Sequence, residues 1–132
     1  GGSSPSTGFD CSGLMYYVLT QYGYSMKRVA NDQMTQGTYV SRSDLQVGDL
    51  VFFGYSGYAN HVGMYIGGGN FVHASTPSTG VRVNSLDESY YKARFLCGRR
   101  IIWRSNHDIP APGLLKKRRG LRISKGRMYG AK

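Results

Sequence analysis

The first hydrophobic pattern in the chain has the period of a helix. Apolar residues recur at spacings of three and four positions, at Cys11, Leu14, Met15, Val18, Leu19 and Tyr22. Asp10 stands directly before them, where an aspartate side chain can cap the first turn, and Gly23 stands where a helix commonly ends. We therefore predict a helix over residues 11–22 with one face packed against a core.

After this segment the pattern changes to alternation or to short apolar runs, which are typical of strands. The runs are residues 49–53, 61–66, 70–74, 81–83 and 95–102. One early helix followed by about five short strands predicts an α+β domain, in which the helix packs on an antiparallel sheet.

Two of these runs flank three glycines and predict a β-hairpin. A loop of three residues, 67–69, pairs Ile66 with Asn70 and places His61 and His73 on the same face as diagonal neighbours. A loop of four residues would place the two histidines on opposite faces. We predict the shorter loop.

Charge divides the chain into two parts. Residues 1–102 hold eight Lys and Arg against six Asp and Glu, whereas the last thirty residues hold nine against one. The net charge of +10 therefore belongs mainly to the C-terminal segment, which follows the linker-like sequence 109–113. We predict one folded domain, 1–103, and a basic, solvated tail, 104–132, in a chain of 132 residues. No apolar run approaches the roughly 20 residues that span a bilayer, so no transmembrane segment is predicted.

Cys11 is a candidate nucleophile because it lies at the predicted helix start, where unpaired backbone N–H groups and the helix dipole favour a thiolate. His61 is the candidate base, and His73 is the candidate group that orients it. Backbone N–H groups at the helix start are natural donors to an oxyanion. Cys97 offers two alternatives, a disulfide with Cys11 or a place in the core, and its apolar surroundings favour the core. Zinc is a weaker alternative, because neither Cys-x-x-Cys nor His-x-x-x-His occurs. We predict no metal and no cofactor.

Four segments of the chain together resemble the NlpC/P60 family of papain-like cysteine peptidases. The segments are GGSSPSTGFDCSGLMYYVL, DLQVGDLVFF, HVGMYIGGGNFVHAS and CGRRI, in the order that the family has them, over residues 1 to about 102. The resemblance implies a papain-like fold, with Cys11 as nucleophile, His61 as base and His73 as the polar residue that orients the base. These are the roles already suggested by the residues themselves.

The resemblance also implies a substrate, the stem peptide of peptidoglycan, commonly cleaved between γ-D-glutamate and a diamino acid. It places Asp10 and Ser12 near the substrate, although Asp10 can simply cap its helix. It implies an extracellular or wall-associated protein. Family members usually carry a tyrosine a few residues before the Gly-Gly with which this sequence begins, so we expect the domain to lack its usual upstream segment.

Two other functions remain open from the sequence. The first is a wall-binding module that keeps the fold without the chemistry, and the second is an amidase or acyltransferase on the same scaffold. The basic tail can attract anionic wall polymers, an acidic membrane surface or nucleic acid through charge alone. We expect no specific nucleic-acid partner.

Overall fold

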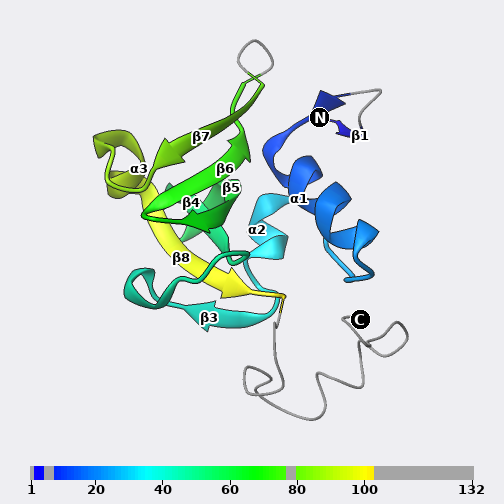
Figure 1. Cartoon of the computed structure of the whole chain (residues 1–132), viewed down its shortest axis with the longest axis horizontal. Coiled ribbons are helices and arrows are strands. Elements are labelled where there is room, and N and C mark those ends of the chain that lie inside the picture. The colour runs from blue at the N-terminus through cyan, green and yellow to red at the C-terminus, as the bar shows by residue number, and fades with distance from the viewer. Residues whose placement is uncertain (1, 5–7, 77–79, 103–132) are drawn as a thin grey trace.

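The computed structural model describes residues 2–4, 8–76 and 80–102, and a six-stranded antiparallel sheet forms its centre. The order of strands across the sheet is β3-β8-β4-β5-β6-β7 (Figure 1). Their bounds are β3 (Thr38–Val40), β4 (Leu50–Tyr55), β5 (Tyr58–Gly67), β6 (Asn70–Ala74), β7 (Val81–Ser85) and β8 (Phe95–Arg100). A separate antiparallel pair, β1 (Ser3–Ser4) and β2 (Gly8–Phe9), lies beside the first helix.

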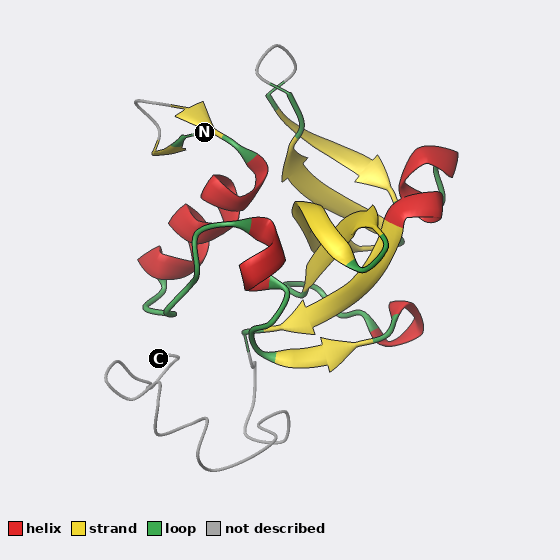
Figure 2. Ribbon diagram, turned by 180° about the vertical axis from the view of Figure 1, so that it is seen from behind, coloured by secondary structure: helices red, strands yellow, loops and turns green. Residues whose placement is uncertain are grey.

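Two helices cover one side of the sheet. These are α1 (Cys11–Gln21), which contacts β5 and β6, and α2 (Ala30–Gln33), which contacts β5. On the other side lies α3 (Ser89–Arg94), as both Figure 1 and the reverse view in Figure 2 show. A short 3-10 turn, η1 (Arg42–Asp44), connects β3 to β4. The predicted α+β arrangement, with the helix of Cys11 on an antiparallel sheet, is confirmed; the sequence patterns missed the short elements β3, α2 and α3.

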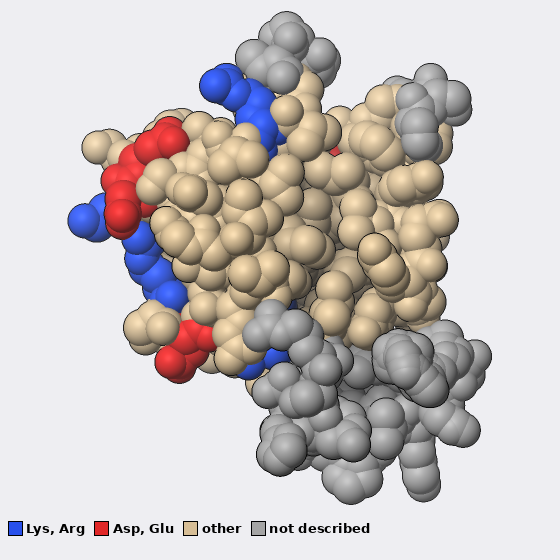
Figure 3. Space-filling model, viewed as in Figure 1, with Lys and Arg blue, Asp and Glu red and all other residues tan. Residues whose placement is uncertain are grey.

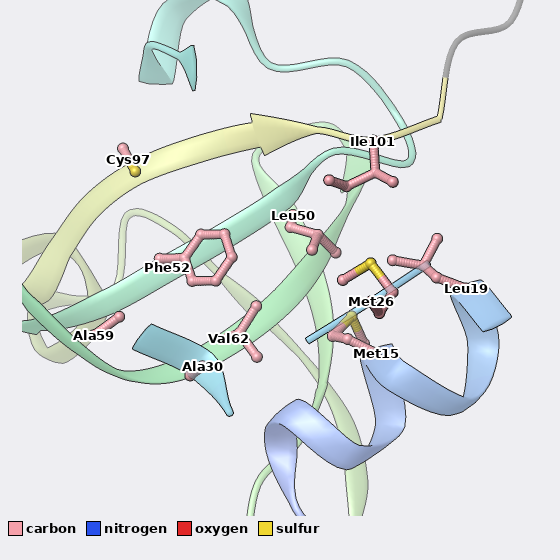
Figure 4. Close-up of a cluster of buried hydrophobic side chains, with 10 residues drawn as sticks. All are labelled: Met15, Leu19, Met26, Ala30, Leu50, Phe52, Ala59, Val62, Cys97 and Ile101. Carbon is pink, nitrogen blue, oxygen red and sulfur yellow. The ribbon is translucent and has the colours of Figure 1, made fainter. Parts of the chain in front are cut away.

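Strand β4 is buried on both faces, which explains its unbroken apolar sequence. Leu50 and Phe52 join the core under α1 and α2, which Figure 4 shows. Val51 and Phe53 point to the opposite face and pack with Phe71. Because each of these β4 side chains is at most 1% exposed, burial contributes about 2 kcal/mol apiece to folding.

The hairpin between β5 and β6 differs from its predicted form at the turn but not at the histidines. Gly67 pairs with Asn70 around a turn of two residues, and Ile66 is an extra residue in β5. Gly68 and Gly69 both have positive φ, as the two central residues of a tight hairpin turn require. The predicted pairing of Ile66 with Asn70 is therefore wrong. Because the bulge takes up one residue, the strands beyond it keep the predicted register, and His61 and His73 lie on the same face.

The predicted tail, 104–132, and the predicted domain boundary at residue 103 lie outside the described residues. Within the described part of the chain, no helix is long and apolar enough to cross a membrane. On the face shown in Figure 3, basic and acidic side chains lie together along the edge that carries α3 and β3. The described residues visible on this face therefore form no extended surface of one charge, and the excess of basic residues in the sequence belongs to the C-terminal segment.

Candidate active site

Cys11 is the first residue of α1, and the cap of that helix holds it in place. Asp10 has extended backbone geometry, and its Oδ1 accepts a hydrogen bond from the Gly13 N–H at 2.6 Å. This is the capping interaction that the sequence predicts for Asp10. It places the Cys11 thiol at the positive end of the helix dipole.

The glycine-rich segment before the helix packs directly onto its first turn. The Asp10 N–H donates to the Gly2 carbonyl at 3.0 Å. A Cβ added to Gly13 would lie 1.9 Å from the same carbonyl oxygen, so this position has room for glycine alone. The segment therefore helps to fix the position of the first turn of the helix and of Cys11 within it.

A second bulge brings β5 against the cysteine. Phe53 of β4 pairs with His61, but the next residue, Gly54, pairs with Ala59, which leaves Asn60 as the extra residue. The carbonyl of Asn60 accepts the hydrogen of the Cys11 thiol at 3.9 Å, and the backbone of Val62 also bonds to the sulfur. Bulges commonly redirect side chains next to active sites. Here the sulfur contacts the backbone on both sides of His61.

The two histidines form the hydrogen-bonded pair that the sequence predicts. Nε2 of His61 lies 2.8 Å from Nδ1 of His73, with the rings almost perpendicular. His73 is fully buried and packs against the rings of Phe71 and Tyr91. Because Nε2 of His61 is occupied by His73, Nδ1 is the ring nitrogen that remains for exchange of a proton with the thiol.

Two polar residues that the sequence analysis missed extend this pair. Nε2 of His73 lies 2.7 Å from Oδ1 of Asn84 on β7, and the Asn84 amide nitrogen donates to both carboxylate oxygens of Glu88, at 3.2 and 3.1 Å. The alternation Arg82, Val83, Asn84 was the available signal, because it places Asn84 on the face of β7 that His73 occupies on β6. Its use required the β6–β7 register, in which His73 pairs with Arg82.

Tyr91 of α3 is a further neighbour that the sequence did not single out. Its ring lies 6.5 Å from the His61 ring, nearly parallel to it, and 5.5 Å from the His73 ring. The helix that carries Tyr91 therefore covers the histidine pair from the side opposite α1.

Burial keeps both reacting groups neutral in the free protein. Desolvation lowers the pKa of His61 from 6.5 to about 4, and the neighbouring His73 adds to this effect. Burial also raises the pKa of the Cys11 thiol, while hydrogen bonds from the backbone of Val62 and Ser12 act in the opposite direction. At neutral pH the free site thus holds a neutral thiol at Cys11 and a neutral imidazole at His61.

Asp10 and Ser12, the predicted substrate contacts, are both held by Arg28. The guanidinium donates to the Ser12 hydroxyl at 3.0 Å and to Oδ2 of Asp10 at 3.2 Å. Although partial burial opposes it, the hydrogen bond from Arg28 lowers the pKa of Asp10. Asp10 thus has a cap and an ion pair within the protein, and contact with a substrate stays a prediction for both residues.

The two rival interpretations of Cys11 find no support in the described structure. Cys11 and Cys97 are both free, and Cys97 is buried in the core under the helices, so the disulfide alternative is wrong. Among residues 2–4, 8–76 and 80–102, no group of three or more His, Cys, Asp or Glu side chains is placed to hold a metal ion.

Two curated relatives match most of the length of this chain. The murein DD-endopeptidase MepS/murein LD-carboxypeptidase of Escherichia coli K12 is 44% identical over 105 residues, which cover 79% of this chain and 55% of that protein. The γ-D-glutamyl-L-lysine dipeptidyl-peptidase of Bacillus subtilis 168 is 40% identical over 96 residues, 70% of this chain and 32% of that protein. The chain thus spans about half or less of the length of these relatives.

Solved structures agree with the sequences. An NLP/P60 family protein of Staphylococcus aureus, described as similar to a lipoprotein, superposes with a TM-score of 0.69 at 38% identity, over 79% of this chain and 36% of that one. The peptidoglycan hydrolase RipB of Mycobacterium tuberculosis gives a TM-score of 0.64 at 33% identity, over 74% and 47% of the two chains. The predicted papain-like fold is confirmed. The NlpC/P60 family model matches residues 1–100, and this chain belongs to that family of peptidases.

Proposed function

We propose that this chain is a peptidoglycan hydrolase, a cysteine endopeptidase that cleaves stem peptides through an acyl-enzyme on Cys11. The observation that carries the proposal is the placement of the thiol against the backbone on both sides of His61, whose imidazole is in turn bonded to His73. The relative from E. coli is a murein endopeptidase, that from M. tuberculosis is a peptidoglycan hydrolase and that from B. subtilis is a γ-D-glutamyl-L-lysine dipeptidyl-peptidase, which together support the substrate class.

In the first step the sulfur attacks the carbonyl carbon of the scissile amide. The thiol proton passes to Nδ1 of His61 as the S–C bond forms, and the carbonyl oxygen takes up negative charge. Backbone N–H groups in the first turn of α1 stabilise that charge. When the tetrahedral species collapses, the C–N bond breaks and the leaving amine takes the proton from His61.

In the second step water releases the acyl group. His61 accepts a proton from the water as its oxygen attacks the thioester carbon, and the C–S bond then breaks. The sulfur recovers the proton from His61, which restores the neutral pair. His73 does not change its own proton count in this cycle; it holds the His61 ring and accepts its Nε2–H.

Two bonds in the stem peptide are candidates for cleavage. The bond between γ-D-glutamate and the diamino acid is the one that the sequence resemblance implies, and the name of the B. subtilis relative agrees with it. The bond in D,D cross-links is favoured by the E. coli relative, which has the higher identity of the two. We propose the γ-D-glutamyl bond and treat the D,D bond as the second candidate.

Mass spectrometry of fragments released from purified peptidoglycan separates these possibilities. Fragments that end at γ-D-glutamate are expected with the wild-type chain and not with Cys11→Ala. Cross-linked dimers converted to intact monomers would show D,D cleavage instead. Equal release by both proteins would exclude Cys11 as the nucleophile, and transfer of the acyl group to an added amine would indicate an acyltransferase.

The place of action follows from this substrate, and we propose that the protein works outside the cell or at the wall. Residues 104–132 are proposed to increase contact with anionic wall polymers through their charge. Loss of this segment should weaken binding to whole walls without slowing cleavage of a small soluble peptide, whereas equal loss of both would show that the segment belongs to the fold.

A further inference from the structure

Asn84 and Glu88 form the outer end of a hydrogen-bonded row that begins at His61. Asn84 lies on β7, opposite Phe71 and diagonal to His73. Glu88 follows that strand, and besides holding the Asn84 amide it accepts the Ser85 N–H at 2.9 Å. Glu88 is exposed, whereas His73, between His61 and Asn84 in the row, is fully buried. The row thus connects a residue at the surface to the interior of the site.

The carboxylate of Glu88 determines which ring nitrogen carries the hydrogen in neutral His73 and in neutral His61. A carboxylate only accepts hydrogen bonds, so the Asn84 NH₂ group must face Glu88 and its oxygen must face His73. That oxygen accepts only, so Nε2 of His73 carries a hydrogen. A neutral His73 then has an unprotonated Nδ1, which accepts the hydrogen of Nε2 of His61. What remains on neutral His61 is an unprotonated Nδ1.

We propose that Asn84 and Glu88 are positioning residues that set the protonation pattern of both histidines, so that His61 presents an unprotonated Nδ1 to Cys11. This role rests on the proposed function, which gives Nδ1 its use as the base. Neither residue touches the reacting atoms. Without the row, His61 can place its hydrogen on Nδ1, and in that form it cannot accept the thiol proton.

Glu88 acts by orienting the Asn84 amide rather than through the field of its charge. Glu88 is exposed to water, so its field at the histidines is screened. Its two oxygens nevertheless decide which end of the Asn84 amide turns inward, because the other orientation would set an amide oxygen against a carboxylate. Arg82, which pairs with His73 across the strands, is the other charge near this row and is left unchanged in the variants below.

Three variants separate this role from support of the fold. Asn84→Leu keeps the size of the side chain but removes the acceptor for His73. Glu88→Gln leaves an amide that can turn either way, so the orientation of Asn84 is no longer fixed. The double variant Asn84→Asp with Glu88→Gln restores the pattern, because the Gln amide donates to the Asp carboxylate, and that carboxylate accepts from His73. Asp87→Asn is the control, since it removes a neighbouring acid that pairs with Arg42 rather than with Asn84.

We expect kcat to fall about tenfold to a hundredfold in Asn84→Leu, as the loss of a partner for a buried polar group implies, with KM changed less than about twofold. Glu88→Gln should lower kcat about threefold, and both the double variant and Asp87→Asn should stay within about twofold of the wild type. Equal activity of Asn84→Leu and the wild type would overturn the proposal. So would a double variant as weak as Asn84→Leu although it folds.

The direct test is long-range ¹H–¹⁵N NMR of the histidine rings, in a His107→Asn background that leaves His61 and His73 as the two imidazoles. The wild type should show both rings protonated at Nε2 alone near pH 7, and Asn84→Leu should show a mixture. A hydrogen on Nδ1 of either ring in the wild type, or no change in Asn84→Leu, would refute the role. Since this signal needs no turnover, an inactive protein with the expected rings would contradict the proposed function alone.

Discussion

The helix side of the site, which carries Cys11, and the sheet side, which carries the histidines, are held by different kinds of contact. On the helix side, the position of Cys11 is set by the Asp10 side chain that caps Gly13 and by main-chain contacts, namely the bond from Asp10 to Gly2 and the bulge at Asn60. On the sheet side, the state of the base is set by side chains, in the row from His61 to Glu88. We therefore expect substitutions on the helix side to reduce stability and activity together, and substitutions on the sheet side to reduce activity more than stability.

The largest effect is expected from the inner end of the sheet side. His61→Ala removes the base and should lower kcat about a thousandfold. His73→Ala removes a group that only orients the base, so a loss of about thirtyfold to a hundredfold is expected, and the melting temperature should also fall because His73 is fully buried. Steady-state kinetics on a soluble stem peptide measures both; the reverse order of the two losses would exchange their roles.

On the helix side, Gly13→Ala should reduce stability and activity together. Its Cβ would lie 1.9 Å from the Gly2 oxygen and 2.6 Å from Oδ1 of Asp10, so the first turn must shift. We expect the free energy of unfolding to fall by about 2 kcal/mol, a cost typical of overpacking, and kcat to fall with it. Urea unfolding followed by fluorescence measures the first. Gln21→Ala, at the exposed end of α1, is the control and should change neither. Full activity in Gly13→Ala would show that the glycine-rich segment does not set the position of Cys11.

The depressed pKa of His61 gives the site an unusual pH dependence. The form in which both Cys11 and His61 are neutral exists between the pKa of His61, about 4, and the raised pKa of Cys11, so kcat/KM should stay high well below pH 6. Its acid limb should lie near pH 4 to 5 rather than near 6.5. A pH–rate profile with an acid limb at 6.5 would contradict the burial of His61.

The lowered pKa of His61 also makes the free energy of unfolding depend on pH. Between pH 4 and 6.5 the unfolded chain binds a proton at His61 that the folded chain does not, so stability rises with pH across this window. The contribution is at most about 3 kcal/mol at neutral pH and is lost as the pH falls toward 4. Unfolding in urea at pH 4.5 and 7, compared with the same pair for His61→Asn, measures it. An equal pH difference in both proteins would assign the effect to other groups.

The smallest effect is expected at Asp10. Asp10→Asn keeps a good cap but loses the charge that pairs with Arg28 at 3.1 Å, and because that pair is partly exposed, stability should fall by less than about 1 kcal/mol. If Asp10 also contacts the substrate, as the family resemblance implies, KM should rise about fivefold with kcat unchanged. An unchanged KM would show that the Asp10 carboxylate does not contact the substrate and serves only as the helix cap and as the partner of Arg28.

Sequence periodicity predicted the elements that are long and regular. The helix from Cys11 follows from its apolar spacing and its cap, and the strands around β4 and β5 follow from their apolar runs. Strand β3 escaped because three residues are too few to show alternation, and α2 and α3 escaped because four and six residues make fewer than two helical turns. The candidate nucleophile and the histidine pair were within reach because each belongs to a local motif.

Other parts of the site depend on contacts that no local pattern encodes. The bulge at Ile66 changed the predicted turn, yet it preserved the register that brings His61 to His73. Asn84 and Arg28 act on residues 11 and 16 positions away in sequence, and their partners are fixed only by the β6–β7 register and by the loop after α1. A sequence pattern can thus name the candidate reacting groups, whereas the residues that contact and orient them require the fold.

The most direct test of the central claim is the exchange of one atom, in Cys11→Ser, followed on purified peptidoglycan with the wild type in parallel. The serine hydroxyl keeps the size and the helix-start position but is a far weaker acid than a thiol, so His61 cannot activate it to the same extent. We predict fragment release by the wild type and none above background by Cys11→Ser, with both proteins unfolding at the same temperature. Release of the same fragments at the wild-type rate by Cys11→Ser would contradict the account.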